Sequence, residues 1–193
     1  MSLVDQLRKP PSAFHRERLN VIDGCDFGPV SRRIADEETH IPRDRIQDGI
    51  NNLKRYYAVA LLDPLNPHAV SEAVDPFWHT HVLFTRPYIE FCIAAVGQYI
   101  HHEPLDQHDK DKVEHVARLY DHTRDVYEKL FTAVDDSWWP ARNGRAHEVV
   151  CLHQLLSQPD VVRNALFPAD PRLTEGATPE QLQRRGLPAS TRN

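Results

Sequence analysis

Histidines gather in one stretch of this sequence. Four of the twelve histidines, His79, His81, His101 and His102, lie between residues 74 and 104. The first pair belongs to the segment WHTH and the second pair to the segment HHEP. Imidazole is the commonest protein ligand for transition metals. We therefore expect histidines of WHTH and HHEP to meet around one metal ion, with all four as candidate ligands.

Nearby residues supply carboxylates and polar groups for such a site. Asp75 or Glu103 would complete the ligand set or orient a histidine. Asp75 has an alternative role as the N-cap of a helix, because it stands directly before Pro76. Tyr88 and Arg86 would line a substrate pocket. The candidate catalytic residues are thus Glu103, Tyr88 and Arg86, and Asp75 joins the histidines as a candidate metal ligand.

The ligand types allow iron, copper or zinc. Two histidines and one carboxylate with open positions form the site of non-haem Fe(II) oxygenases, whereas three histidines and a water resemble catalytic zinc. We favour a metalloenzyme that oxidises a small molecule, with metal-assisted hydrolysis as the second hypothesis. The alternative is a non-catalytic helical binding module in which the histidines hold a structural zinc or are simply packed in the core. The sequence contains no nucleophile elbow, P-loop, dinucleotide fingerprint or HExxH motif.

A helix from Pro76 to about Val96 is expected to carry WHTH. Gly97 is suited to the left-handed residue that ends it, and Pro87 predicts a kink near residues 85–86. On a regular helix, residues two apart point to nearly opposite sides, so His79 and His81 should diverge. A helix of this length spans about 30 Å, and a break at Pro87 would shorten the path back from HHEP to WHTH.

Apolar residues repeat at helical spacing along most of the chain, and no strand pattern stands out. We predict an all-α fold, a compact domain of about five to six helices with a flexible C-terminal tail. The clearest helices are expected over residues 30–39, 43–62 and 107–131. Weaker helical segments are expected over residues 4–9, 13–22, 146–156 and 160–166.

Composition divides the chain into three parts. Residues 1–29 are expected to form an N-terminal arm, and residues 30–167 the helical domain that carries the histidine cluster. Residues 168–193 are rich in Pro, Arg, Gln, Thr and Glu, so they are expected to bury too little surface to stay ordered.

Charge and cysteine content exclude several classes of protein. The net charge is −5 with neutral histidine, which provides no positive field for nucleic acid. No apolar run approaches the ~20 residues of a bilayer span, and the polar start lacks the apolar core of a signal peptide. The three cysteines include no CxxC pair. We expect a cytoplasmic protein with a small-molecule substrate and with neither nucleic acid nor a membrane as partner.

Several other histidines and Cys92 are expected to have structural or surface roles. His108, His115 and His122 are seven residues apart and predict a solvated or half-buried helix face. An alternative is that one of these three rings lends a ligand to the main cluster. His68 is expected at the surface, and Cys92 is expected to be a small buried side chain rather than a ligand.

The histidine stretch also resembles a known family. The segments VDPFWHTHVL, TR-Y, C, G and HHEP are similar to the pattern of the glycine-rich domain-containing protein-like family, and the likeness covers about residues 30–132. Phe91 and Val96 depart from that pattern, and the C-terminal part lacks the Gly/Cys-rich tail of many relatives. The resemblance implies a small helical domain with a functional histidine cluster, and it implies no particular reaction.

Overall fold

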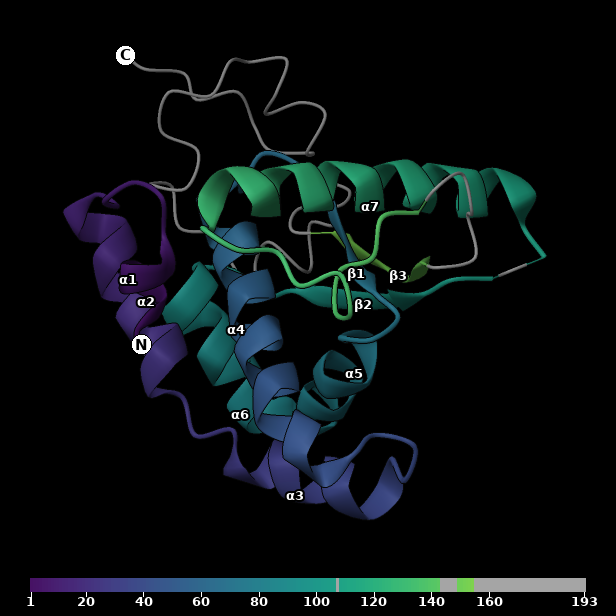
Figure 1. Cartoon of the computed structure of the whole chain (residues 1–193), viewed down its shortest axis with the longest axis horizontal. Coiled ribbons are helices and arrows are strands. Elements are labelled where there is room, and N and C mark those ends of the chain that lie inside the picture. The colour runs from purple at the N-terminus through teal and green to yellow at the C-terminus, as the bar shows by residue number, and fades with distance from the viewer. Residues whose placement is uncertain (107, 143–148, 155–193) are drawn as a thin grey trace.

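The computed structural model describes residues 1–106, 108–142 and 149–154. Within these residues the chain forms seven α-helices, a 3₁₀ turn, a π-helical turn and three short strands (Figure 1). In chain order the elements are α1 (Leu3–Gln6), α2 (Ala13–Gly24), α3 (Gly28–Glu37), η1 (Arg43–Arg45), α4 (Ile46–Leu62), β1 (His68–Ser71), α5 (Asp75–Leu83), α6 (Thr85–Phe91), η2 (Cys92–Val96), β2 (His101–Pro104), α7 (Lys110–Leu130) and β3 (Val149–Gln154).

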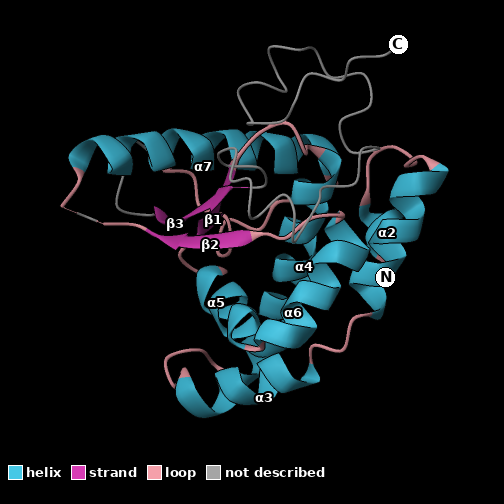
Figure 2. Ribbon diagram, turned by 180° about the vertical axis from the view of Figure 1, so that it is seen from behind, coloured by secondary structure: helices cyan, strands magenta, loops and turns pink. Residues whose placement is uncertain are grey.

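Helices dominate the architecture, and the predicted helical fold class is confirmed. Helix α7 runs along one side of the small sheet, and helices α3, α5 and α6 lie on the other side (Figures 1 and 2). Helix α4 stands beside the sheet and contacts α7. The helices predicted over residues 30–39, 43–62 and 107–131 correspond to α3, to η1 with α4, and to α7. None of the helices in the described part of the chain is long and apolar enough to cross a membrane.

A three-stranded sheet, which the sequence did not predict, joins distant parts of the chain. Its order is β1-β3-β2 and both pairings are antiparallel. His153 of β3 stands in register with His68 of β1 on one side and with His102 of β2 on the other. Through β3, the sheet therefore connects β1, which follows α4, to the HHEP segment in β2.

The helix predicted over residues 146–156 is wrong where the structure describes it, because residues 149–154 form β3. An apolar run this short has no period that separates helix from strand, and its place between two other strands decides its structure. The helix predicted over residues 160–166 and the tail over residues 168–193 lie outside the described residues.

Helix α4 runs through the centre of the core. Its residues from Tyr56 to Leu61 are all inaccessible to solvent, so other parts of the chain surround this segment. Buried hydrogen bonds tie α4 to its neighbours. Asn52 Oδ1 accepts one from Tyr127 Oη of α7 and one from Trp139 Nε1, both at 3.1 Å. Leu3 and Leu19, from α1 and α2, belong to the same core, so part of the segment expected as an N-terminal arm is packed into the domain.

The helical stretch after Asp75 breaks near Pro87, as predicted. Helix α5 ends at Leu83 and α6 begins at Thr85, with Phe84 between them in a non-helical conformation. Leu83 is the residue whose carbonyl a proline ring at position 87 would meet in a continuous helix, which explains the position of the break. Gly97, with a φ of 83°, ends η2 in the left-handed region, so its predicted role is confirmed.

Candidate metal centre

The structure brings WHTH and HHEP together through one histidine of each, next to Asp75. The ring centroids of His79 and His102 are 4.9 Å apart. His102 Nε2 lies 3.6 Å from Asp75 Oδ1. One side-chain nitrogen or oxygen of each residue lies within 4.8 Å of those of the other two. We call Asp75, His79 and His102 the α5 group.

Local structure explains why these three residues meet. Asp75 and His79 are four residues apart in the first turn of α5, so they share one face of the helix. The break at Phe84 and the turn at Gly97 reverse the chain, so that β2 returns beside α5. The indole of Trp78 lies against the His102 ring, with 4.8 Å between centroids.

Tyr88 links the two segments that carry the histidines. Its hydroxyl accepts a hydrogen bond from Trp78 Nε1 at 3.0 Å and donates one to the backbone oxygen of Ile100 at 2.8 Å. Burial raises the pKa of Tyr88 well above its usual value of 10, so the hydroxyl keeps its proton. Tyr88 therefore positions α5 against the start of β2, and its hydroxyl is already engaged rather than directed toward a substrate pocket.

Burial in the α5 group is uneven. The side chains of His102 and Asp75 are only 9% and 15% exposed, whereas His79 is exposed. Asp75 Oδ1 is inaccessible to solvent, and no hydrogen bond from the described residues reaches it. A buried carboxylate oxygen without a donor is costly and calls for a partner such as an ion or a water.

The spacing of the group suits a single ion. Two ligand atoms bound at ~2.1 Å to one tetrahedral ion lie about 3.4 Å apart. The 3.6 Å between His102 Nε2 and Asp75 Oδ1 is close to this value. His79, on the solvent side, would be the third ligand. Two imidazoles and one carboxylate form the donor set that iron and zinc sites use.

His81 lies in a separate, aromatic environment. It is 4% exposed, and its ring contacts those of Phe27 and Phe91. Its Nδ1 lies 2.8 Å from Tyr57 Oη. Burial lowers the pKa of His81 to about 4, so the ring is neutral near pH 7. The structure thus places His81 in the core, on the side of α5 away from His79, as the helical rotation between them requires.

The remaining predicted site residues lie in different places. His101 precedes His102 in β2, and its ring contacts Tyr99 with 4.6 Å between centroids. Adjacent residues of a strand face opposite sides, which explains why His102 alone joins the α5 group. Arg86 is exposed and pairs with Glu90 at 3.4 Å. Glu103 lies in β2, where its backbone pairs with that of Leu152.

Asp75 does not serve as the N-cap. Val74 occupies that position, and no side chain caps α5. The turn before the helix is closed by Ser71 instead, whose backbone and hydroxyl oxygens accept hydrogen bonds from the Val74 backbone nitrogen. With Ser71 closing this turn, the Asp75 carboxylate is left to face the two histidines.

A second group of the same composition was missed by sequence reasoning. Asp63, His68 and His122 also have side-chain nitrogen or oxygen atoms within 4.8 Å of one another, and we call them the α7 group. His68, expected at the surface, is 0% exposed, because β1 is covered by α7. As predicted for a solvated or half-buried helix face, His122 is half-buried and His108 and His115 are exposed. One signal was available: each group begins with an Asp-Pro pair.

The fold and the two groups define a mainly helical protein with candidate metal ligands on both sides of a small sheet. A family model described as UCP032817-like matches residues 17–123, and the chain belongs to this family. The matched range includes all six residues of the α5 and α7 groups. Comparisons with curated proteins and with solved structures gave no match.

This family assignment corrects the resemblance drawn from the histidine motifs. The match is to the UCP032817-like family, and nothing in the comparisons indicates a glycine-rich domain-containing protein. Short motifs such as WHTH and HHEP fix few positions, so unrelated helical proteins with histidine pairs can share them. The name of the family states no activity.

Proposed function

We propose that the protein binds one divalent transition-metal ion through Asp75, His79 and His102, and that the bound ion acts on a small molecule in the cytoplasm. The observation that carries this proposal is that ligand atoms of Asp75, His79 and His102 lie within 4.8 Å of one another, while Asp75 Oδ1 is buried without a hydrogen-bond donor among the described residues. An ion at this point would satisfy Asp75 Oδ1 and would use both imidazoles as ligands.

The donor set favours oxidative chemistry. Two histidines and one carboxylate leave coordination positions open, which is the arrangement of non-haem Fe(II) oxygenases. The exposure of His79 leaves one side of the group accessible to a substrate and to dioxygen. On the other side, Trp78 and its contact with His102 shield the ligands from water. Iron is therefore the first candidate, and zinc with hydrolytic chemistry is the second.

Metal analysis of the purified protein tests this proposal. We expect the wild type to bind metal at this group, and His79→Ala and Asp75→Asn each to lose one equivalent. His115→Ala is the matched control, because His115 is exposed on α7 and belongs to neither group. Equal metal content in all four proteins would contradict the proposal. Zinc at the α5 group whose removal unfolds the domain would indicate a structural site instead.

The open coordination position is tested separately. Nitric oxide added to the anaerobic Fe(II)-loaded protein is expected to give the electron paramagnetic resonance signal of an iron–nitrosyl complex. His79→Ala should lose this signal and His115→Ala should keep it. An Fe(II)-loaded wild type that gives no nitrosyl signal would contradict oxygen chemistry at this group.

A further inference from the structure

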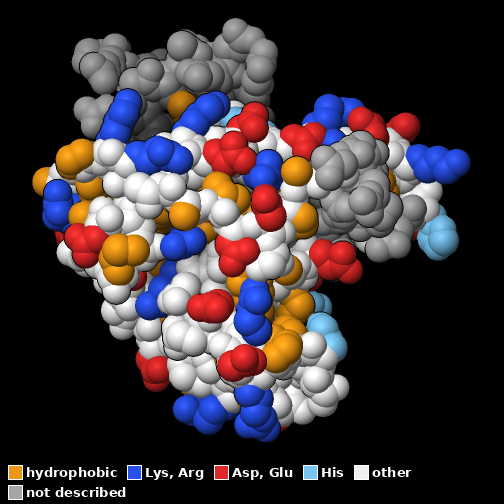
Figure 3. Space-filling view, in the orientation of Figure 1, with side chains coloured by type: hydrophobic (Ala, Val, Ile, Leu, Met, Phe, Trp, Pro, Cys, Tyr) orange, Lys and Arg blue, Asp and Glu red, His pale blue; other side chains and the backbone are white. Residues whose placement is uncertain are grey.

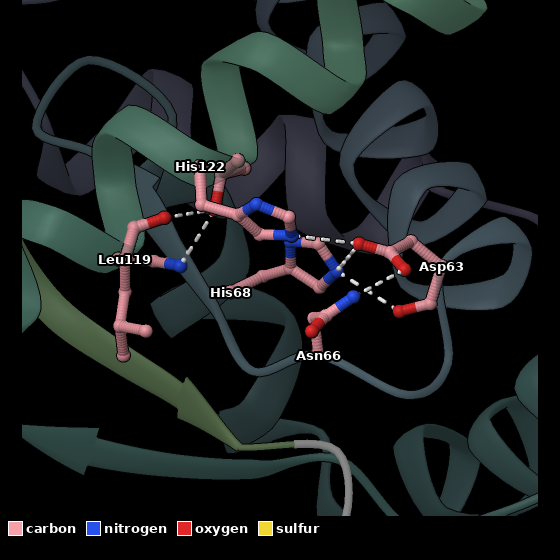
Figure 4. A network of polar contacts seen from close by, with 7 residues as sticks. Asp63, Asn66, His68, Leu119 and His122 are labelled. Carbon is pink, nitrogen blue, oxygen red and sulfur yellow. Dashed lines mark hydrogen bonds and ion pairs between the residues drawn. The ribbon is translucent and has the colours of Figure 1, made fainter. Parts of the chain in front are cut away.

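The α7 group joins three elements that are far apart in the chain. Asp63 directly follows α4, His68 opens β1, and His122 lies in the middle of α7. Figure 4 shows both rings directed toward the Asp63 carboxylate. His122 Nε2 lies 2.8 Å and His68 Nε2 lies 3.4 Å from the same oxygen, Asp63 Oδ2. The 3.4 Å separation equals the ~3.4 Å between two ligands of one tetrahedral ion, whereas the 2.8 Å separation is the length of a hydrogen bond.

The hydrogen bonds of Thr123 fix the hydrogen on His68. The Thr123 hydroxyl donates to the backbone oxygen of Leu119 at 2.8 Å and accepts from the backbone nitrogen of Ala69 at 3.0 Å. Its only hydrogen is therefore used. His68 Nδ1, 3.3 Å from the same hydroxyl oxygen, carries a hydrogen and donates it. A neutral His68 consequently has its lone pair on Nε2.

On this side of the ring lie two oxygen atoms of Asp63. His68 Nε2 lies 3.1 Å from the backbone oxygen of Asp63 and 3.4 Å from its carboxylate. Three atoms with lone pairs at these distances repel one another unless a cation stands between them. The cation is either a second proton on His68 or a metal ion. A second proton would make His68 the partner of the Asp63 carboxylate in a buried ion pair, whereas a metal ion would be bound by the same oxygen and by both rings. Zinc titration separates these two cases.

The surroundings orient the group as a ligand set. A metal-bound histidine commonly donates its other ring N–H to a fixed acceptor, as His68 does to Thr123. The carboxylate is held in turn, because Asn66 Nδ2 donates to Asp63 Oδ1 at 2.7 Å and leaves Oδ2 directed at the two rings. The His68 and His122 rings stack with 5.5 Å between centroids, so their Nε2 atoms face the same side.

From this geometry we infer a second cation site, in which Asp63 Oδ2, His68 Nε2 and His122 Nε2 bind a zinc-like divalent ion. The ion takes the place of the hydrogen that His122 Nε2 donates to Asp63 Oδ2 in the metal-free protein, and neutral His122 then carries its hydrogen on Nδ1. The site is structural, since its ion ties the end of α4 and the start of β1 to α7. It is distinct from the α5 group, because β3 lies between the strands that carry His68 and His102, which places their backbones about 10 Å apart. The inference goes beyond the proposed function and does not depend on it.

Zinc titration of metal-free protein tests the second site. By isothermal titration calorimetry the wild type should bind two equivalents of Zn²⁺. His122→Ala should bind one, His79→Ala one, and the double variant none, while His115→Ala keeps both. His122 is the position of choice, because its side chain is 40% exposed and its loss does not hollow the core. One equivalent in the wild type that is lost in His122→Ala alone would support the second site and overturn the proposed function.

The inference is overturned if His122→Ala binds as many zinc equivalents as the wild type. It is also overturned if nuclear magnetic resonance shows both nitrogens of His68 protonated after zinc is added, since the cation is then a proton. Thermal unfolding gives an independent readout. Zinc should raise the midpoint of His79→Ala and leave the midpoint of the His79→Ala/His122→Ala double variant unchanged.

Discussion

The α5 and α7 groups have the same composition and opposite surroundings. Each contains an aspartate that precedes a proline, a histidine in the first two residues of a strand and a histidine on a helix. In the α7 group, Asp63 accepts hydrogen bonds at both oxygens and His68 is anchored by Thr123. In the α5 group, Asp75 Oδ1 has no donor among the described residues, and His79 is exposed.

This difference separates two uses of the same ligand types. Structural metal sites are closed and held by their surroundings, whereas catalytic sites keep an open position. The α7 group lies where three elements must be joined, and the α5 group lies where one histidine meets solvent. The surroundings of the residues, more than their identity, therefore assign the two roles.

The largest expected contrast is in stability. His68→Ala should lower the free energy of unfolding of the metal-free protein by roughly 2 to 4 kcal/mol, because it leaves a cavity and buried groups without partners. His79→Ala should change it by less than about 0.5 kcal/mol, because His79 is exposed. Urea denaturation of both variants measures the difference. Equal losses would remove the distinction between the two groups.

A histidine outside both groups provides a pH reference. Burial lowers the pKa of His81 to about 4 in the fold, from its ordinary value of 6.5. Between pH 4 and pH 6.5 the unfolded chain binds a proton at His81 and the folded chain does not. The stability that the buried neutral ring contributes is therefore complete above about pH 6.5 and is lost as the pH falls toward 4. The loss should reach about 3 kcal/mol, and His81→Phe should remove it. Parallel pH profiles for wild type and His81→Phe would contradict this assignment.

The two aspartates should respond differently to neutralisation. Asp63→Asn should cost roughly 1 to 3 kcal/mol in metal-free protein, since a carboxylate that accepts from Asn66 and His122 is replaced. Asp75→Asn should be neutral or slightly stabilising, because a buried charge without a hydrogen-bond donor at Oδ1 is removed. Denaturation midpoints compare them. A larger loss for Asp75→Asn would reverse the contrast.

The smallest expected effect concerns Tyr88. Tyr88→Phe removes the hydrogen bonds to Trp78 and Ile100, which should cost about 1 kcal/mol of stability. Because these bonds position the α5 group, metal affinity there should fall about tenfold while the α7 group is unaffected. Calorimetric zinc titration of Tyr88→Phe in a His122→Ala background measures the affinity of the α5 group alone. Unchanged affinity would show that Tyr88 serves packing alone.

The sequence predicted the helices and part of the α5 group, for a clear reason. Helical periodicity and the punctuation by Pro87 and Gly97 are local signals, so they located α5, α6 and the break between them. Helical rotation predicts that His79 and His81 point to opposite sides of α5. Which of the two is buried depends on the side of the helix that faces the core. The choice between His101 and His102 depends on strand β2, which is recognisable only once its partner β3 is in place.

The α7 group was beyond local patterns. Asp63 and His68 lie in a turn and a strand that read as a surface loop, and His122 is 54 positions after His68. The three meet because α7 packs across β1, a tertiary contact with no periodic signature. His122 was considered as a contributor to the WHTH cluster, whereas the structure places it beside Asp63 and His68.

Anomalous scattering from crystals grown with one equivalent of Fe(II) tests the central claim most directly. We predict a peak at the iron absorption edge within bonding distance, about 2.1 Å, of Asp75, His79 and His102. A crystal of folded protein that shows no such peak, or shows iron at other side chains only, would contradict the account.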